Sequence, residues 1–204
     1  MPRRLMLTVH LLVTITIAGC GPLATARVEV TPDIANFKVK IVAILPFEGI
    51  TFPKEQEEFA GWWKQNYPNN GEVISDMLAT ELIGTGGFTY IERSQIRKVL
   101  EEKGFSLVEL VQKKSASDIG KLLGADAVVV GTVGKLRDWT NVIGMSGCNL
   151  AFSARMVHSE TGAILWSASV NRQEGTADVL GLARQECRGI AEQLRAKLPS
   201  KPTQ

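Results

Sequence analysis

Cysteine is the residue type in this chain best suited to covalent chemistry, and Cys20 has the most informative surroundings of the three cysteines. It ends the sequence Ile17-Ala18-Gly19-Cys20. Arg3 and Arg4 stand near the amino terminus, and the predominantly apolar run Leu5–Ile17 follows them. Positive charge, an apolar run and small residues in this order are typical of a secretory signal peptide.

The small residues before Cys20 resemble the bacterial lipobox, in which the cysteine thiol is acylated and the chain is cut so that cysteine becomes its first residue. The alternatives are an ordinary signal peptide with an incidental cysteine and an uncleaved membrane anchor. The anchor is disfavoured because the apolar run is shorter than the roughly 20 residues that a transmembrane helix needs. We therefore predict that residues 1–19 are a lipoprotein signal peptide and that Cys20 is lipidated.

Lipidation predicts a location at a membrane surface outside the bacterial cytoplasm. Each buried methylene contributes about 0.8 kcal/mol, so several acyl chains hold a folded domain on a bilayer, whereas one chain gives only marginal binding. Gly21 follows the cysteine, in place of the Asp that resembles the inner-membrane retention signal of enteric bacteria. The predicted location is therefore the outer membrane, with the lipid-anchored chain facing the periplasm.

The charge balance disfavours a nucleic-acid partner. The chain has 23 Lys and Arg against 21 Asp and Glu, and removal of residues 1–19 takes away Arg3 and Arg4, which leaves 21 of each sign. Nucleic-acid-binding domains usually carry a net basic surface, and no run of like charges is present here. The 185 residues that remain of 204 suit a single domain with a hydrophobic core.

Catalytic patterns are scarce in the sequence. The chain after residue 19 has one histidine, His158, which lies beside a predicted turn and is expected to be exposed. Glycine loops for phosphate, nucleophile elbows and multi-histidine metal spacings do not occur. Glu55, Glu57 and Glu58 could supply a carboxylate pair for glycoside cleavage, but a solvated charge run is the favoured interpretation. We predict no catalytic residue, no metal and no cofactor, and hence no enzyme.

Cys148 and Cys187 leave two alternatives open. An oxidising periplasm would permit them to form a disulfide. The sequence by itself does not establish that their Cα atoms lie within the distance that a disulfide requires. Cys187 continues the apolar face of a predicted helix, where a buried free thiol is common.

Hydrophobic periodicity predicts alternating strands and helices followed by a hairpin. Val39–Leu45 and Ala127–Val133 are almost wholly apolar, which is typical of strands covered on both faces. Leu150–Met156 alternates in polarity and is followed by the turn Ser159–Gly162 and a returning strand, Ala163–Val170. A further strand is predicted at 88–91. Three helices are predicted, the first from near Asn70 to Gly84, the second from near Ser94 to Gly104 and the third from near Ser117 to Gly124. A C-terminal helix is predicted over 179–194. The hairpin makes the sheet mixed and excludes a doubly wound fold.

Two stretches outside these elements are predicted to attach the domain to the lipid and to bind a partner. Residues 20–37, with Cys20 at their start, are rich in turn formers and predict a tether. The loop 48–69 carries five aromatic residues: Phe52, Phe59, Trp62, Trp63 and Tyr67. Because loops lie on the surface and exposed apolar clusters mark binding sites, we predict that Phe59, Trp62, Trp63 and Tyr67 bind a partner protein. The alternative is that Trp62 and Trp63 pack with Phe59 onto the domain.

Five stretches in the same order resemble the curli secretion lipoproteins, the CsgG-like family: KIVAILPF (40–47), MLATEL (77–82), GFTYIERSQ (87–95), GADAVVVGT (124–132) and TGAILWS (161–167). The resemblance runs from about Val39 to Leu198. It implies a periplasmic domain over 38–198 that is a mixed-sheet α/β sandwich, similar to anticodon-binding and TolB amino-terminal domains, with the C-terminal helix packed on the sheet. Residues 199–204 are then a tail. Glu92-Arg93 is expected to make a local ion pair or backbone hydrogen bond, and Trp166 to lie in the core or an interface.

The family's best-known member forms an outer-membrane pore to which each subunit donates two long transmembrane hairpins. This sequence departs from that pattern, because 134–149 and 171–176 are too short for two membrane-crossing strands and a turn. The resemblance implies a non-catalytic lipoprotein that contacts other envelope proteins, or further copies of itself, in assembling or transporting cell-surface material. A periplasmic activator of a peptidoglycan synthase, acting as a monomer, is the alternative.

Overall fold

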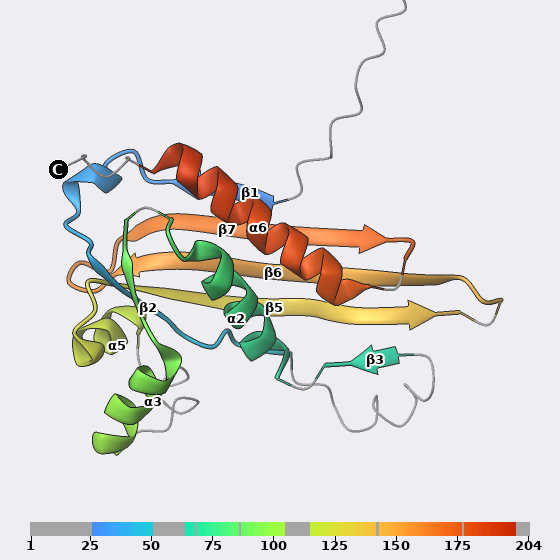
Figure 1. Ribbon diagram of the computed structural model, residues 1–204, viewed down its shortest axis with the longest axis horizontal. Helices are drawn as coiled ribbons and strands as arrows, with labels where there is room; N and C mark the ends of the chain where they lie inside the picture. The colour runs from blue at the N-terminus through green and yellow to red at the C-terminus, as the bar shows by residue number, and fades with distance from the viewer. Residues whose placement is uncertain are drawn as a thin grey trace, which may run out of the picture.

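One mixed β-sheet organises the protein. The computed structural model describes residues 26–50, 64–67, 69–85, 87–104, 115–141, 143–176 and 178–198. In this part of the chain, seven strands form a sheet of order β1-β7-β6-β5-β2-β4, with β3 paired to β5 off this path (Figure 1). The strands are β1 (Ala26–Val30), β2 (Ile41–Ile44), β3 (Lys64–Asn66), β4 (Thr89–Ile91), β5 (Ala127–Thr140), β6 (Ser146–His158) and β7 (Ile164–Glu174).

The helices cover both faces of this sheet where β2 and β5 meet. They are α2 (Asn70–Leu82), α3 (Arg93–Glu102), α5 (Ala116–Leu123) and α6 (Val179–Lys197), with a short 3-10 helix η1 (Ile34–Asn36). Val42 and Val129 point into the large core under α2 and α6, whereas Ala43 and Val128 point into a smaller core with α3 and α5. This two-sided burial explains why β2 and the start of β5 are apolar at every position. The predicted mixed α/β sandwich, with its C-terminal helix on the sheet, is confirmed.

The sheet begins earlier than the sequence predicted. Residues 26–30, assigned to the tether of 20–37, form the edge strand β1, which pairs antiparallel with β7. Ala26 and Val28 are buried in the core, and the side chains of Gln193 and Lys197 in α6 donate to their carbonyl oxygens. The tether prediction is therefore wrong for this segment, whose alternation of Ala26, Val28 and Val30 with charged residues is that of a half-buried strand.

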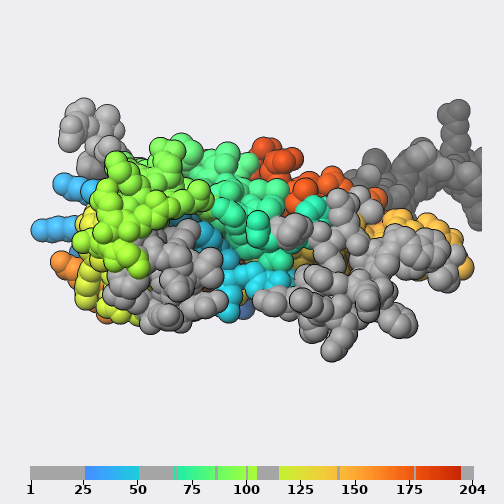
Figure 2. Space-filling view, turned by 90° about the horizontal axis from the view of Figure 1, so that it is seen from below, coloured from blue at the N-terminus to red at the C-terminus, as the bar shows by residue number. Residues whose placement is uncertain are grey.

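The predicted end of one strand at Val133 and start of the next at Leu150 are also wrong. β5 and β6 continue through most of the intervening residues as one antiparallel hairpin, with register pairs from Lys135 opposite Ala151 to Thr140 opposite Ser146. A register irregularity at Gly134 separates this extension from the body of the sheet. The hairpin projects from one end of the molecule in both overall views (Figures 1 and 2).

Two local predictions are settled by burial. His158 is buried, against the expectation of exposure, with its ring edge-on to Phe37 and its Nδ1 3.0 Å from Thr161 Oγ1. Cys148 and Cys187 are free thiols, both buried. Burial raises the pKa of Cys187 to about 12 and also raises that of Cys148, so neither forms a reactive thiolate near neutral pH. No helix in the described ranges has the length and apolarity needed to cross a membrane.

The edge strand gives a direct test of where the domain starts. Val28→Ala should lower the free energy of unfolding by about 2 kcal/mol, because Val28 is only 3% exposed and the lost methyl groups leave a cavity. The neighbouring Arg27→Ala is the control. Its ion pair with Glu29 is exposed (side chains 80% and 62%), so denaturant unfolding should detect little change. Identical unfolding curves for Val28→Ala and the unmodified protein would contradict the assignment of 26–30 to the sheet.

Candidate protein-binding surface at the base of the β5–β6 hairpin

Tyr67 and Asp138 fix the returning end of the aromatic-rich loop to the sheet. β3 pairs antiparallel with β5, which places Gln65 opposite Asp138. The hydroxyl of Tyr67 donates to Oδ2 of Asp138 at 3.0 Å, and Oδ1 of the same carboxylate accepts from the backbone N–H of Val179 at 2.8 Å. Asp138 therefore joins the loop, the hairpin and the first residue of α6.

Asn70 fixes the other end of the same loop. Its side-chain oxygen accepts from the N–H of Ile50 at 2.9 Å, and its amide nitrogen donates to the carbonyls of Ile50 and Tyr67. Asn70 was predicted to cap α2, but the cap residue is Asn69, in a left-handed conformation with φ 59°. Gly71 allows the close approach, because a Cβ there would lie 2.0 Å from the carbonyl oxygen of Phe47. Ile50 and Tyr67 are thus held side by side.

The predicted partner-binding residues divide between two parts of the chain. Phe59, Trp62 and Trp63 lie outside the described residues, as does Cys20. Tyr67 is described and half-buried, and it is tied to Asp138 rather than free to meet a partner. Ile50, which precedes the segment 51–63, lies two residues after the bridge between Glu48 and Thr132 at the base of the β5–β6 hairpin, whereas Lys64, which follows the segment, lies opposite Trp139 near the outer end of the hairpin.

The hydroxyl of Tyr67 stays protonated over the physiological range. Its pKa is raised from 10.0 to about 12, first by burial, then by the hydrogen bond and negative charge of Asp138, and last by the charge of Asp178. A neutral hydroxyl is the donor that the Asp138 carboxylate requires. Asp178 also caps the start of α6, because its side chain accepts a hydrogen bond from the backbone N–H of Gly181.

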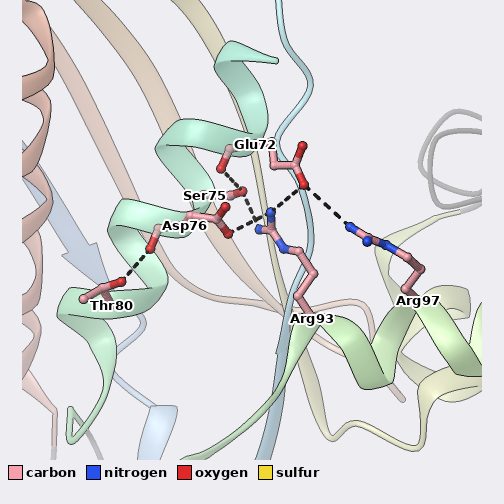
Figure 3. A network of polar contacts seen from close by, with 6 residues as sticks. All are labelled: Glu72, Ser75, Asp76, Thr80, Arg93 and Arg97. Atoms are coloured by element: carbon pink, nitrogen blue, oxygen red, sulfur yellow. Dashed lines mark hydrogen bonds and ion pairs between the residues drawn. The ribbon is translucent and has the colours of Figure 1, made fainter. Parts of the chain in front are cut away.

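Arg93 belongs to a separate polar network that serves packing. It makes ion pairs, as expected for Glu92-Arg93, but its partners come from α2: Glu72 at 3.2 Å and Asp76 at 2.7 Å (Figure 3). It also donates to the hydroxyl of Ser75 at 2.7 Å. The network joins the start of α3 to one face of α2, so a structural role is sufficient for it. Trp166 is buried in the core, in agreement with its prediction.

The described part of the chain has no cluster of side chains suited to a metal ion. No group of three or more His, Cys, Asp or Glu side chains there could hold a metal ion. The one buried carboxylate in that part, Glu186, lies 3.8 Å from Arg172. The described surface offers a long hairpin, and the two points where the aromatic-rich loop attaches lie along it.

Comparison with known proteins adds a family and a fold. The family model for the curli production assembly/transport component CsgG matches residues 38–197. No curated protein matches the sequence. PelC from Paraburkholderia phytofirmans, solved as a dodecamer, is 18% identical, with a TM-score of 0.52 over 84% of this chain and 96% of that chain. Lipoprotein GNA1162 from Neisseria meningitidis is 17% identical, with a TM-score of 0.51 over 78% and 99%. At these identities the two structures establish a shared fold.

The Tyr67–Asp138 clamp predicts a specific alkaline titration. Because folding raises the pKa of Tyr67, its contribution to stability is complete below pH 10.0 and is lost as the pH rises through about 12. Asp138→Asn keeps an oxygen acceptor but removes the charge. It should lower the pKa of Tyr67 part of the way toward 10.0, since burial, the largest cause, remains.

Ultraviolet difference titration measures both tyrosines of the chain, and Tyr67→Phe identifies the signal of Tyr67. Tyr90 is the internal control, because burial raises its pKa above the ordinary range and Asp138 is not among the causes. A Tyr67 titration that is the same in Asp138→Asn and the unmodified protein would contradict the clamp.

Proposed function

Because this chain belongs to the CsgG family, we propose that it is a lipid-anchored envelope protein that acts without catalysis, through protein contacts, in assembling or transporting cell-surface material. The observation that carries the proposal is that the residues flanking the aromatic-rich segment 51–63 are fixed by Asn70 and Asp138, the latter on a projecting hairpin. Large aromatic side chains such as those of this segment are enriched at protein interfaces.

The proposed anchor is an acylated Cys20 in the outer membrane, on its periplasmic side. The lipobox-like sequence supports acylation, and Gly21 supports the outer membrane. The match to a curli assembly/transport family supports an envelope location. The neutral charge balance that remains after residues 1–19 is also in keeping with contacts to proteins and lipid rather than nucleic acid.

We assign different roles to the four aromatic residues of the proposed surface. Phe59, Trp62 and Trp63 contact the partner. Tyr67 positions them, because its hydroxyl is already engaged by Asp138 and its carbonyl by Asn70. The partner is another envelope protein or a further copy of the chain, and the dodecameric state of PelC, which shares the fold, supports the latter.

The number of copies in the native assembly tests this function. The acylated protein, extracted in mild detergent and measured by light scattering with correction for detergent, should have a mass several times that of one chain. Mass spectrometry of its amino terminus should find acyl chains on Cys20. A monomeric, acylated protein would instead favour the alternative of a periplasmic activator of a peptidoglycan synthase. An unmodified amino terminus would contradict the anchor.

Trp62 and Trp63 give the test of the contact surface. Replacing both with Ala should reduce the yield of cross-linked species that contain the protein in intact cells by about tenfold, because buried tryptophans dominate interface energetics. Thermal unfolding should change little. Glu57→Ala with Glu58→Ala is the matched control in the same segment and should leave cross-linking intact. A large drop in thermal stability in the tryptophan variant would show that these side chains belong to the core.

A further inference from the structure

The tip of the β5–β6 hairpin is a closed turn that presents apolar side chains. Oδ1 of Asn141 accepts from the N–H groups of Ile143 at 3.2 Å and Met145 at 2.9 Å, and Asn141 N donates to the carbonyl of Met145 at 2.8 Å. Gly144 closes the turn with a φ of +81°. Ile143 is 76% exposed and Met145 59%. Two large apolar side chains are therefore held in solvent by a turn that the side chain and backbone of Asn141 close.

The end of the hairpin behind this turn carries no charge. Residues 139–149, with the sequence WTNVIGMSGCN, contain no Asp, Glu, Lys or Arg. The hydroxyls of Thr140 and Ser146 are 2.9 Å apart, and the indole of Trp139 lies over Gly147, where a Cβ would be 2.5 Å from the ring. Charged residues begin again at Asp138 in β5, and on the neighbouring strands Lys64 of β3 lies opposite Trp139 and Glu174 of β7 lies opposite Cys148. An uncharged end with a tryptophan behind its apolar tip has the composition of a segment that enters a membrane interface.

The chain enters the fold from the same end. Ala26 lies opposite Val170 and, across β7, level with Phe152 of β6, and β1 then runs away from the tip toward Val30. From Phe152 to Ser146 the strand rises about 20 Å at roughly 3.4 Å per residue. Cys20 precedes Ala26 by six residues, which span at most about 20 Å when extended. An acyl chain on Cys20 is therefore able to reach the level of the tip.

We propose that Ile143 and Met145 at the hairpin tip enter the same bilayer leaflet as the acyl chains of Cys20, as a second, weaker membrane contact. The inference rests on the acylation proposed above. Two side chains bury less apolar surface than one acyl chain, which is itself only a marginal anchor, so the tip sets orientation while the lipid sets affinity. The protein then stands with its long strands directed at the bilayer. The turn at Ser159–Gly162 and the start of β7 point away from it.

Depth-dependent quenching tests this orientation in the full acylated protein. Ile143→Cys is coupled to an environment-sensitive nitrobenzoxadiazole label, and the protein is reconstituted with vesicles of phosphatidylethanolamine and phosphatidylglycerol that carry brominated or ordinary acyl chains. The matched control is the same label on Ile164→Cys, another exposed isoleucine (50%), at the opposite end of the same sheet. The two native thiols in the fold are buried, which directs the label to the introduced cysteine.

The label at position 143 should shift its emission to the blue and lose about half of its intensity or more in brominated vesicles, as expected for burial of roughly 5–10 Å into the interface. The label at position 164 should show neither change. Adding Met145→Glu to the 143-labelled protein should restore most of the lost emission, while the protein still floats with the vesicles through its lipid.

Three results would overturn the inference. Equal, aqueous emission at positions 143 and 164 in protein that floats with the vesicles would refute the tip contact alone. A label at 143 that is shielded from aqueous iodide yet insensitive to brominated lipid would assign the tip to a protein neighbour. Protein that fails to float would refute the lipid anchor and, with it, this orientation.

Discussion

The antiparallel pairing of β5 with β6 is the interaction on which the rest of the structure depends. It runs from Ala127 opposite His158 to Thr140 opposite Ser146. Its first half lies between the two hydrophobic cores, and its second half leaves the body of the domain as the hairpin. β2 and β3 attach to β5, β7 attaches to β6, and the start of α6 is tied to Asp138. Because the hairpin continues strands that are fixed in the core, the body of the sheet sets its direction.

The sequence was sufficient for the elements whose signals are local. β2 and the start of β5 were predictable because they are buried on both faces, which makes nearly every residue apolar. The helix ends were predictable from capping chemistry, although the observed ends differ from the predicted ones by a few residues. Ser115, rather than Ser117, accepts a hydrogen bond from the N–H of Asp118, and Gly124 ends α5 in a left-handed conformation, φ +67°. Trp166 and the face of α6 followed from ordinary burial patterns.

The missed elements are stabilised by distant partners. β1 is five residues long and becomes a strand through pairing with β7, more than 130 residues later in the chain. β3 depends on β5 in the same way. The hairpin extension contains three glycines, Gly134, Gly144 and Gly147, and glycine is unfavourable in strands when judged locally. At Gly147 the ring of Trp139 occupies the space that a side chain would fill. Such long-range compensation leaves no periodic signal.

The candidate site likewise contains residues that local sequence identifies and residues whose role depends on distant contacts. Cys20 and the aromatic-rich loop were recognisable because residue type and local sequence suffice to suggest their chemistry. Asp138 was not, since its role consists of a hydrogen bond from Tyr67, 71 residues away, and one from Val179, 41 residues away. These contacts have a functional consequence that neither partner has alone. They place the returning attachment point of the loop on the half of β5 that leads to the tip, at the end of the molecule where the lipid is proposed. In the proposed arrangement the contact residues lie close to the membrane, where a partner confined to the same surface is met at a higher effective concentration than in free solution.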